Sequence, residues 1–154
     1  MSSPSPELAF RPARAADERL IRDWIRHFSL NPLGIDWRRF ILVTRGDDGP
    51  VVAMGQIKVH GDGSHELASI AVDQAERGRG VARALIQYLL AKEPGDVYLT
   101  CVPDLRDFYR PFGFVDVRDS RGLPTYFRRI AQVTGWLRRF RPGWGPAIML
   151  RRNR

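Results

Sequence analysis

The residues best placed to do chemistry form a short glycine-rich turn, Arg77-Gly78-Arg79-Gly80. The apolar run before it predicts a strand over 65–72, and the spacing of apolar residues after it predicts a helix over 81–92. Unpaired N–H groups and the positive dipole at the start of a helix favour a bound anion. Glycines let the backbone approach that anion closely. The turn therefore predicts a phosphate-binding site; an ordinary strand-to-helix turn is the alternative.

Two common phosphate motifs do not fit this turn, which lacks the Lys-Ser/Thr end of a P-loop and the third glycine of a dinucleotide fingerprint.

The single cysteine, Cys101, is a second candidate for chemistry and lies in the apolar run 97–102, without a convincing His partner nearby in the sequence. We interpret it as a buried small hydrophobe rather than a catalytic thiol. One cysteine also excludes an intrachain disulfide and a thiolate metal cage.

The elements that must position the turn alternate between strands and helices. Strands are predicted at 8–12, 41–45, 51–60, 65–72, 97–102, 114–117 and 146–151, and helices at 15–28, 36–40, 81–92, 104–110 and 126–140. Asp36 and Asp104 are the expected caps of the two short helices. We expect Pro111 to end the second of them at Arg110. This alternation predicts a mixed sheet with helices on its faces.

Two motifs in this framework resemble those of a known family. The pattern Arg77-Xaa-Xaa-Gly80-Xaa-Ala82 matches the Arg/Gln-Xaa-Xaa-Gly-Xaa-Gly/Ala signature of the GCN5-related N-acetyltransferase (GNAT) superfamily. Leu67 to Val72 is similar to that family's fourth strand, and Phe108 to Phe114 is similar to its segment in which Gly-Phe follows a tyrosine after three residues. The order of elements agrees over 8–117, with a final strand near 147.

The resemblance implies the α/β (α+β) acyl-CoA N-acyltransferase fold. Its central sheet is mixed and mostly antiparallel, is flanked by helices, and has splayed fourth and fifth strands. We expect residues 1–154 to form one domain with its core at 8–117, a long basic connection at 119–145 and a last strand at 146–152.

The resemblance also implies acetyl-CoA as co-substrate and no metal. The acetyl group would pass to an amine by direct attack in a ternary complex. Backbone groups of the fourth strand would pair with the pantetheine arm, and those of the turn would hold the pyrophosphate. The cofactor-binding residues implied are Ile70, Ala71, Val72, Arg77, Gly78, Arg79, Gly80, Val81 and Ala82.

Two side chains acquire catalytic roles from the same resemblance. Tyr109 aligns with the tyrosine acid that protonates the CoA sulfur, and a phenol with a pKa near 10 arrives protonated. Glu66, at the start of the strand, is the candidate base, because an amine must lose a proton before or as it attacks. Strand alternation predicts that Glu66 shares a face with Ala68, Ile70 and Val72, and that His65 points to the other face. A half-buried core tyrosine and an exposed strand-end charge are the alternatives.

Two departures from the family pattern affect this region. The stretch Cys101-Val102-Pro103-Asp104 has no Asn where many members have one, and Pro111 follows Tyr109-Arg110 directly. In the family that Asn contacts the cofactor, and Pro111 could shift the tyrosine. In that case catalysis would depend mainly on positioning of the reactants.

The net charge of +8 is concentrated at the C-terminal end. Residues 118–154 hold ten arginines and one aspartate, a net charge of +9, while residues 1–117 carry −1. This segment could attract an acidic acceptor or partner, and we expect neutralising Arg128, Arg129, Arg138 and Arg139 to weaken that preference. The alternative is a structural helix that covers the sheet with Ile130, Val133 and Leu137.

Two other function classes remain open beside the enzyme. The chain could be a catalytically silent acetyl-CoA-binding regulatory module, or a basic nucleic-acid-binding protein. The last reading lacks a recognised base-reading motif. The Ser/Pro-rich start is not a secretory signal and no run of 18 apolar residues occurs, so we expect a cytoplasmic protein that does not enter the membrane. The amine acceptor and the oligomeric state, with a homodimer as one option, are not revealed.

Overall fold

The computed structural model of the chain describes residues 6–153. Within this range, hydrogen bonds connect seven strands in the order β1 (Leu8–Pro12), β2 (Phe40–Arg45), β3 (Val51–Val59), β4 (His65–Val72), β5 (Val97–Cys101), β7 (Ala147–Arg151) and β6 (Val115–Asp116). Residue contacts group the chain into two compact units, of which the first comprises residues up to Ile57 together with Leu67–Lys92, and the second comprises Lys58–Glu66 together with residues from Glu93 onward. The division therefore falls across the hairpin formed by β3 (Val51–Val59) and β4 (His65–Val72).

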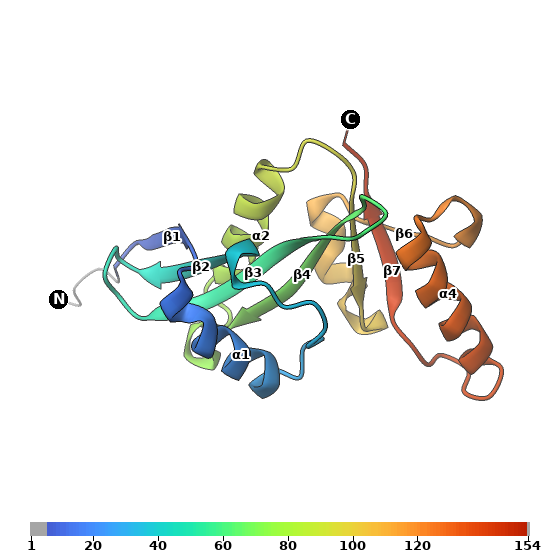
Figure 1. The fold of residues 1–154 in the computed structure, drawn as a ribbon, viewed down its shortest axis with the longest axis horizontal. Helices are drawn as coiled ribbons and strands as arrows, with labels where there is room; N and C mark the ends of the chain where they lie inside the picture. The colour runs from blue at the N-terminus through green and yellow to red at the C-terminus, as the bar shows by residue number, and fades with distance from the viewer. Residues whose placement is uncertain (1–5, 154) are drawn as a thin grey trace. The chain divides into compact units, whose positions relative to one another are not determined.

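The first unit is built on antiparallel strands with a helix on each face (Figure 1). β1 (Leu8–Pro12) pairs with β2 (Phe40–Arg45), which pairs with β3. On one face, Ile21 and Ile25 of α1 (Glu18–His27) pack in a buried cluster with residues of the strands that include Phe40, Leu42, Met54 and Ala71. The helix predicted at 15–28 is thereby confirmed over Glu18–His27.

The other face of this unit is covered by α2 (Val81–Ala91), which buries Leu85, Ile86, Leu89 and Leu90. Gly55 of β3 lies under this helix. A Cβ atom at Gly55 would come within 2.5 Å of Ile70 Cδ1 and 3.2 Å of Leu85 Cδ2 and Leu89 Cδ1. Glycine here therefore allows α2 to pack closely on the sheet and places the Ile70 side chain on the α2 face.

In the second unit, β5 (Val97–Cys101) pairs in parallel with the start of β4 and antiparallel with β7 (Ala147–Arg151), which pairs with β6 (Val115–Asp116). Among the described residues the β4–β5 pairing covers only His65–Val97 and Glu66–Tyr98. The predicted mixed, mostly antiparallel sheet with a splay between its fourth and fifth strands is thus confirmed. No helix within residues 6–153 is long and apolar enough to cross a membrane.

Two helices of the second unit differ in detail from the sequence prediction. Asp104 does not cap its helix, because Val102 is the N-cap of a 3-10 turn that has Pro103 at its first position and leads into α3 (Arg106–Tyr109). Pro111 does not end the helical geometry at Arg110, since a further 3-10 turn runs to Phe112. Proline is tolerated in the first turn of a helix, which explains both differences.

The long basic connection contains α4 (Thr125–Arg138), close to the helix predicted there, which lies along β7 in Figure 1. Phe127 is fully buried, and Ile130 and Ala131 pack with it against Tyr98 and Ile148. The prediction that Val133 faces the sheet is wrong, because Val133 is 59% exposed. The covering stripe follows Phe127, Ile130, Ala131 and Thr134, at the spacing of one helical face.

Asp62, at the tip of the β3–β4 hairpin, holds the N-terminal turn of α4. Its carboxylate accepts hydrogen bonds from Ser64 Oγ (2.5 Å), Ser64 N (2.9 Å) and Tyr126 N (2.8 Å). These bonds, the Ser64 hydroxyl first, lower the pKa of Asp62 to about 2. The carboxylate therefore links two segments of the second unit that are far apart in sequence.

We expect Asp62→Ala to lower the free energy of unfolding by up to about 1 kcal/mol near neutral pH, as for loss of an exposed helix cap. Because the pKa is lower in the folded than in the unfolded chain, the contribution is complete above about pH 4 and is lost as the pH falls toward about 2. Urea unfolding at several acidic pH values measures both effects. Asp47→Ala, an exposed carboxylate in the β2–β3 turn, is the control; an equal loss there would contradict the assignment.

Candidate active site

The glycine-rich turn takes the backbone geometry that its composition favours. Gly78 and Gly80 have φ values of +76° and +78°, and Gly80 is the left-handed N-cap of α2. Nothing lies within 4 Å of the position that a Cβ atom would occupy at either glycine. The glycines therefore serve the left-handed conformation, which costs other residues about 1–2 kcal/mol, and they leave the surface of the turn open to a ligand.

The backbone N–H groups of residues 78–83 have no hydrogen-bond partner among residues 6–153; the first bond of this stretch is Ala84 N to Gly80 O at 3.0 Å. The side chains of Arg77, Arg79 and Arg83 are exposed around them, while Val81 is buried and anchors the helix start. Unpaired N–H groups, a helix dipole and three guanidinium groups together form a surface suited to phosphate.

The connection between β4 and α2 is held by one capping hydrogen bond and one ion pair. Asp73 accepts a hydrogen bond from Ala75 N at 2.9 Å and caps the 3-10 helix Gln74–Glu76. Glu76 pairs with Arg45 at 2.5 Å, and this hydrogen bond lowers the pKa of Glu76. The ionised pair ties the turn to the end of β2, so that the turn is positioned before any ligand arrives.

The backbone of β4 is interrupted at Ser69, whose φ is +58°. The fully buried Gln56 holds this residue, because its Nε2 donates to Ser69 Oγ at 2.9 Å. A left-handed residue inside a strand is typical of a bulge, which disturbs the alternation of faces and the ladder of hydrogen bonds. The predicted common face of Glu66, Ala68, Ile70 and Val72 therefore does not extend past Ser69. Beyond it, Ile70 faces α2 and Ala71 joins the α1 cluster.

Tyr109 is the last residue of α3 and is half-buried between the rings of Phe108 and Phe114, at centroid distances of 5.0 and 6.1 Å. Burial, with a smaller contribution from Cys101, raises the pKa of Tyr109 to about 12. Its hydroxyl has no hydrogen-bond partner within the described part of the chain. The phenol is therefore protonated at any working pH and available to donate.

Glu66 is only 6% exposed, so that the reading of an exposed strand-end charge is wrong. Its Oε2 lies 2.7 Å from His60 Nε2, and its Oε1 accepts a hydrogen bond from Thr100 Oγ1 at 3.3 Å. The His60 ring stacks on the Tyr126 ring, with 3.6 Å between the ring centroids. Burial, followed by the charge of Glu66, raises the pKa of Tyr126. The carboxylate is thus oriented by a ring that is itself held in place.

The other sequence candidates are also placed. His65 bonds Glu93 at 2.6 Å instead of Glu66, in agreement with its expected opposite direction. Cys101 is buried, and burial raises the pKa of its thiol, which makes it a poor nucleophile. The predicted cofactor-binding residues all lie in the first unit, and Tyr109 and Glu66 lie in the second. Within residues 6–153 no hydrogen bond joins Tyr109 to Glu66.

Sequence reasoning did not find His60 and Thr100 as partners of Glu66. A signal for His60 was present, because the Gly61-Asp62-Gly63 turn brings His60 back alongside the following strand, where His60 N donates to Ser64 O at 2.9 Å. Thr100 had no local signal, since it reaches Glu66 only through the parallel pairing of β4 and β5. Thr100 could therefore be identified as a partner of Glu66 only after the fold was known.

Comparison with known proteins gives a family match over most of the chain. Residues 6–114 match the model described as the acetyltransferase (GNAT) family. No curated protein sequence matches the chain. Similar solved structures include N-acetylglutamate synthase from Neisseria gonorrhoeae complexed with coenzyme A and N-acetyl-glutamate, with a TM-score of 0.71 and 17% identity over 99% of this chain. The chain spans only 37% of that protein.

Two further solved structures match along nearly their whole length. Rv2747 from Mycobacterium tuberculosis, in complex with CoA and NLQ, has a TM-score of 0.69 and 20% identity, covering 95% of this chain and 99% of that one. Ard1 from Thermoplasma volcanium has a TM-score of 0.62 and 16% identity, covering 94% and 97%. At identities this low, the TM-scores show a shared fold.

Proposed function

We propose, since the chain belongs to the acetyltransferase (GNAT) family, that residues 1–154 form one domain that transfers an acetyl group from acetyl-CoA to an amine. The family match confirms the resemblance stated from the sequence. The single observation that carries the proposal is the turn at 78–83, where unpaired N–H groups and exposed arginines form a cradle for the pyrophosphate of CoA. Two of the solved structures with a similar fold contain bound CoA, which supports CoA as the ligand of this turn.

In this proposal the pantetheine arm lies along Ile70, Ala71 and Val72. The pairing of β4 with β5 supports that arrangement, because among the described residues it covers only His65 and Glu66 and does not extend to Ile70, Ala71 and Val72. Arg77, Gly78, Arg79, Gly80, Val81 and Ala82 bind the pyrophosphate. The ligand would pair with strand backbone in the manner of an added strand.

Two side chains of the second unit carry the chemistry. The amine nitrogen attacks the thioester carbonyl, the C–S bond breaks, and the departing sulfur takes the proton of Tyr109. Glu66, oriented by His60 and Thr100, accepts the proton of the amine through water, because the buried carboxylate has little room for direct contact with an acceptor. Each role is a general acid or base step, which typically contributes about 100- to 10,000-fold to rate.

The test measures both binding and turnover. Acetyl-CoA should raise the melting temperature of the protein, whereas ATP at the same concentration should not; dephospho-CoA reports on the 3′-phosphate. Release of the CoA thiol is then followed with a panel of amines. Stabilisation by acetyl-CoA without any acceptor-dependent thiol release would favour the second candidate, a silent acetyl-CoA-binding module. Absence of stabilisation at millimolar acetyl-CoA would contradict both.

Gly80→Ala tests the cradle directly. We expect the dissociation constant for acetyl-CoA to rise about tenfold, because a left-handed alanine costs about 1–2 kcal/mol and the strain would displace the N–H groups. Gly34→Ala, at another open glycine with a left-handed backbone (φ +64°), is the matched control and should leave the constant unchanged. Calorimetric titration with acetyl-CoA measures both variants, and equal affinities for Gly80→Ala and the unmodified protein would remove the turn from the binding site.

A further inference from the structure

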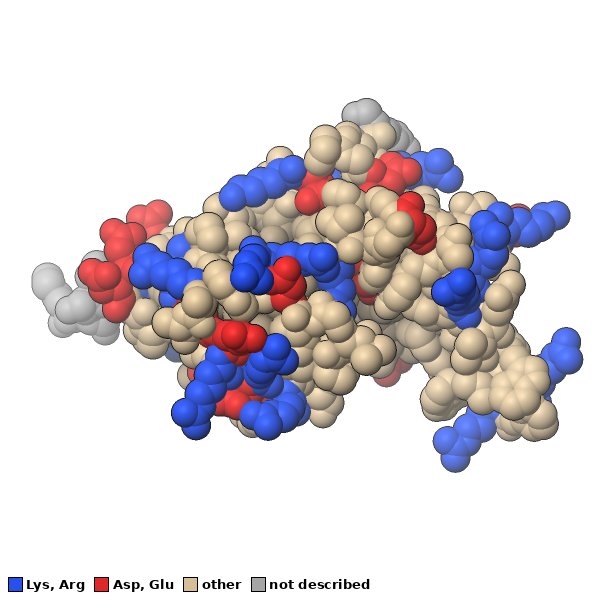
Figure 2. All heavy atoms as spheres, viewed as in Figure 1, with Lys and Arg blue, Asp and Glu red and all other residues tan. Residues whose placement is uncertain are grey.

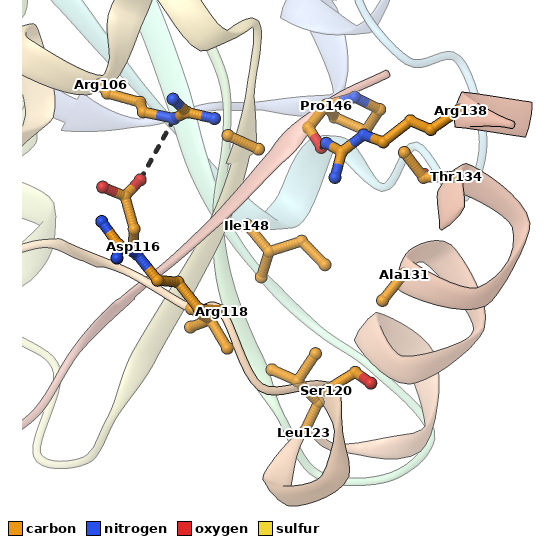
Figure 3. A pocket seen from close by; sticks show the side chains of 12 residues that line it. Arg106, Asp116, Arg118, Ser120, Leu123, Ala131, Thr134, Arg138, Pro146 and Ile148 are labelled. Atoms are coloured by element: carbon orange, nitrogen blue, oxygen red, sulfur yellow. Dashed lines mark hydrogen bonds and ion pairs between the residues drawn. The ribbon is translucent and has the colours of Figure 1, made fainter. Parts of the chain in front are cut away.

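A polar cavity of about 400 Å³ lies within the second unit, between α4 and the strands β6 and β7. Figure 3 shows Arg106, Asp116 and Arg118 along one wall, residues Ala131, Thr134 and Arg138 of α4 along the other, and Ile148 between them. The volume falls within the range of small-molecule sites, about 300–1,000 Å³. The three α4 residues are spaced as i, i+3 and i+7, so one face of the helix forms the wall.

The charge of this cavity is positive and only partly compensated. Three arginines line it against one aspartate. Asp116 is shared, because it lies 3.2 Å from Arg106 Nε and also accepts a hydrogen bond from Arg110 at 3.0 Å outside the cavity lining. Arg138 donates only to the backbone oxygens of Trp144 (3.0 Å) and Pro146 (3.4 Å). The cavity therefore has cationic groups with no carboxylate of their own.

Several donors of the cavity are unused within residues 6–153. Arg118 makes no hydrogen bond or ion pair. Arg106 Nε is buried without a hydrogen-bond partner, despite its closeness to Asp116. Thr134, only 5% exposed, also has no partner for its hydroxyl. Buried polar groups in native proteins are normally paired, so the buried Nε of Arg106 indicates a missing acceptor. Arg118 is exposed and adds a guanidinium group with no carboxylate of its own.

The cavity is connected to both proposed catalytic residues within the same unit. Arg106 and Tyr109 lie one turn apart on α3. Thr100, which bonds Glu66, pairs in register with Ile148 of the cavity floor. Figure 2 shows that the surfaces of α1 and α4 differ in charge. Over α1, acidic and basic side chains lie together and form the ion pairs Glu18–Arg22 and Asp23–Arg26. Over α4, the basic side chains have few acidic neighbours on the face shown.

We infer that this cavity binds a carboxylate of the acyl acceptor, so that the acceptor is an amine that also carries a carboxylate, such as an amino acid. Arg118 and Arg138 are the residues that select it, with Thr134 as a further donor. Planar guanidinium groups match a carboxylate with paired hydrogen bonds. Of the four arginines that the sequence suggested, only Arg138 lines the cavity; Arg128 donates to Leu123 O instead. The identification of this ligand as the acyl acceptor rests on the proposed function. The binding of a carboxylate in the cavity does not.

The test compares amines that differ only in an anionic group. Thiol release from acetyl-CoA is measured with glycine, L-aspartate and L-glutamate against ethylamine, and with phosphoethanolamine to separate carboxylate from phosphate. We expect kcat/KM to be highest for an amine with a carboxylate. Arg118→Gln should reduce the ratio of kcat/KM for that amine to the value for ethylamine by about 10- to 100-fold, as for loss of a hydrogen bond to a charged group.

Arg118→Gln is the decisive variant, because Arg118 has no partner within residues 6–153 whose loss could unfold the chain. Arg138→Lys keeps the charge but loses the planar guanidinium group, so it should have a smaller effect in the same direction. Arg129→Gln, on the exposed side of α4, is the control and should change nothing. Equal kcat/KM for ethylamine and the carboxylate amines, an unchanged ratio in Arg118→Gln, or a preference for phosphoethanolamine would each overturn the inference.

A direct binding measurement separates this inference from the proposed function. L-Glutamate and L-aspartate are titrated calorimetrically into the protein and into Arg118→Gln. If no amine supports thiol release, the acetyltransferase proposal fails, but binding of either amino acid that weakens in Arg118→Gln would still support the carboxylate site. Acetyl transfer to ethylamine without any calorimetric binding of the two amino acids would overturn the carboxylate site alone.

Discussion

Tyr109→Phe should lower kcat by about 100- to 10,000-fold and leave the affinity for acetyl-CoA nearly unchanged. The substitution keeps the ring that packs between Phe108 and Phe114 and removes only the proton that the departing sulfur would take. Because the pKa of Tyr109 is raised to about 12, its ionisation should not limit the unmodified enzyme below roughly that pH. Steady-state kinetics with a reactive amine from pH 7 to 10 measure the loss.

The control for this prediction is Tyr88→Phe on α2, a tyrosine that stacks on Phe10 and accepts a hydrogen bond from Lys92. It should keep kcat within about twofold, as expected of a surface substitution. If Tyr109→Phe also stays within that range at every pH, then the sulfur is protonated by another group or by water. Catalysis would in that case depend on positioning of the two substrates.

Phe127→Ala should lower the free energy of unfolding by about 3–5 kcal/mol, the usual cost of removing a fully buried phenylalanine. Phe127 is 0% exposed and anchors α4 to the strands of its unit. Its ring packs against three other rings, with distances between ring centroids of 4.7 Å to Tyr98, 5.0 Å to Tyr126 and 5.6 Å to His60. We also expect reduced activity in the folded fraction, because His60 orients Glu66.

Urea unfolding, followed by tryptophan fluorescence, measures this loss. Phe140→Ala, at a side chain that is 72% exposed just beyond α4, is the matched control and should change stability by no more than about 0.5 kcal/mol. A loss below about 1 kcal/mol for Phe127→Ala would mean that α4 contributes little to the packing of the second unit.

Much of the fold was predictable because its signals are local. The spacing of Ile21 and Ile25, the alternating strand runs and the Gly-Arg turn each report their own element within a few residues. The boundaries of helix 104–110 were less predictable. Pro103 and Pro111 each lie in the first turn of a 3-10 helix, so that these prolines extend the helical geometry on both sides of α3 instead of limiting it.

The site was predictable only in part, for a related reason. The cradle at 78–83 is a contiguous segment, so its composition predicted its backbone. Glu66 could be chosen as a candidate, but its burial and its contact with His60 arise from a hairpin and a parallel strand pair. The left-handed conformation of Ser69 had no signal, since it is held by Gln56 from the neighbouring strand rather than by glycine.

The discontinuous division of the chain has a consequence for its synthesis. The first unit is complete in sequence once Lys92 has been made, whereas the second needs Lys58–Glu66 and everything from Glu93 onward. Domains generally form as units in the order in which they leave the ribosome. The hairpin tip that carries His60, Asp62 and Glu66 is therefore made early. The proposed base can meet His60 at once, but it must wait for Thr100, and His60 must wait for Tyr126, until residues beyond Glu93 have been made.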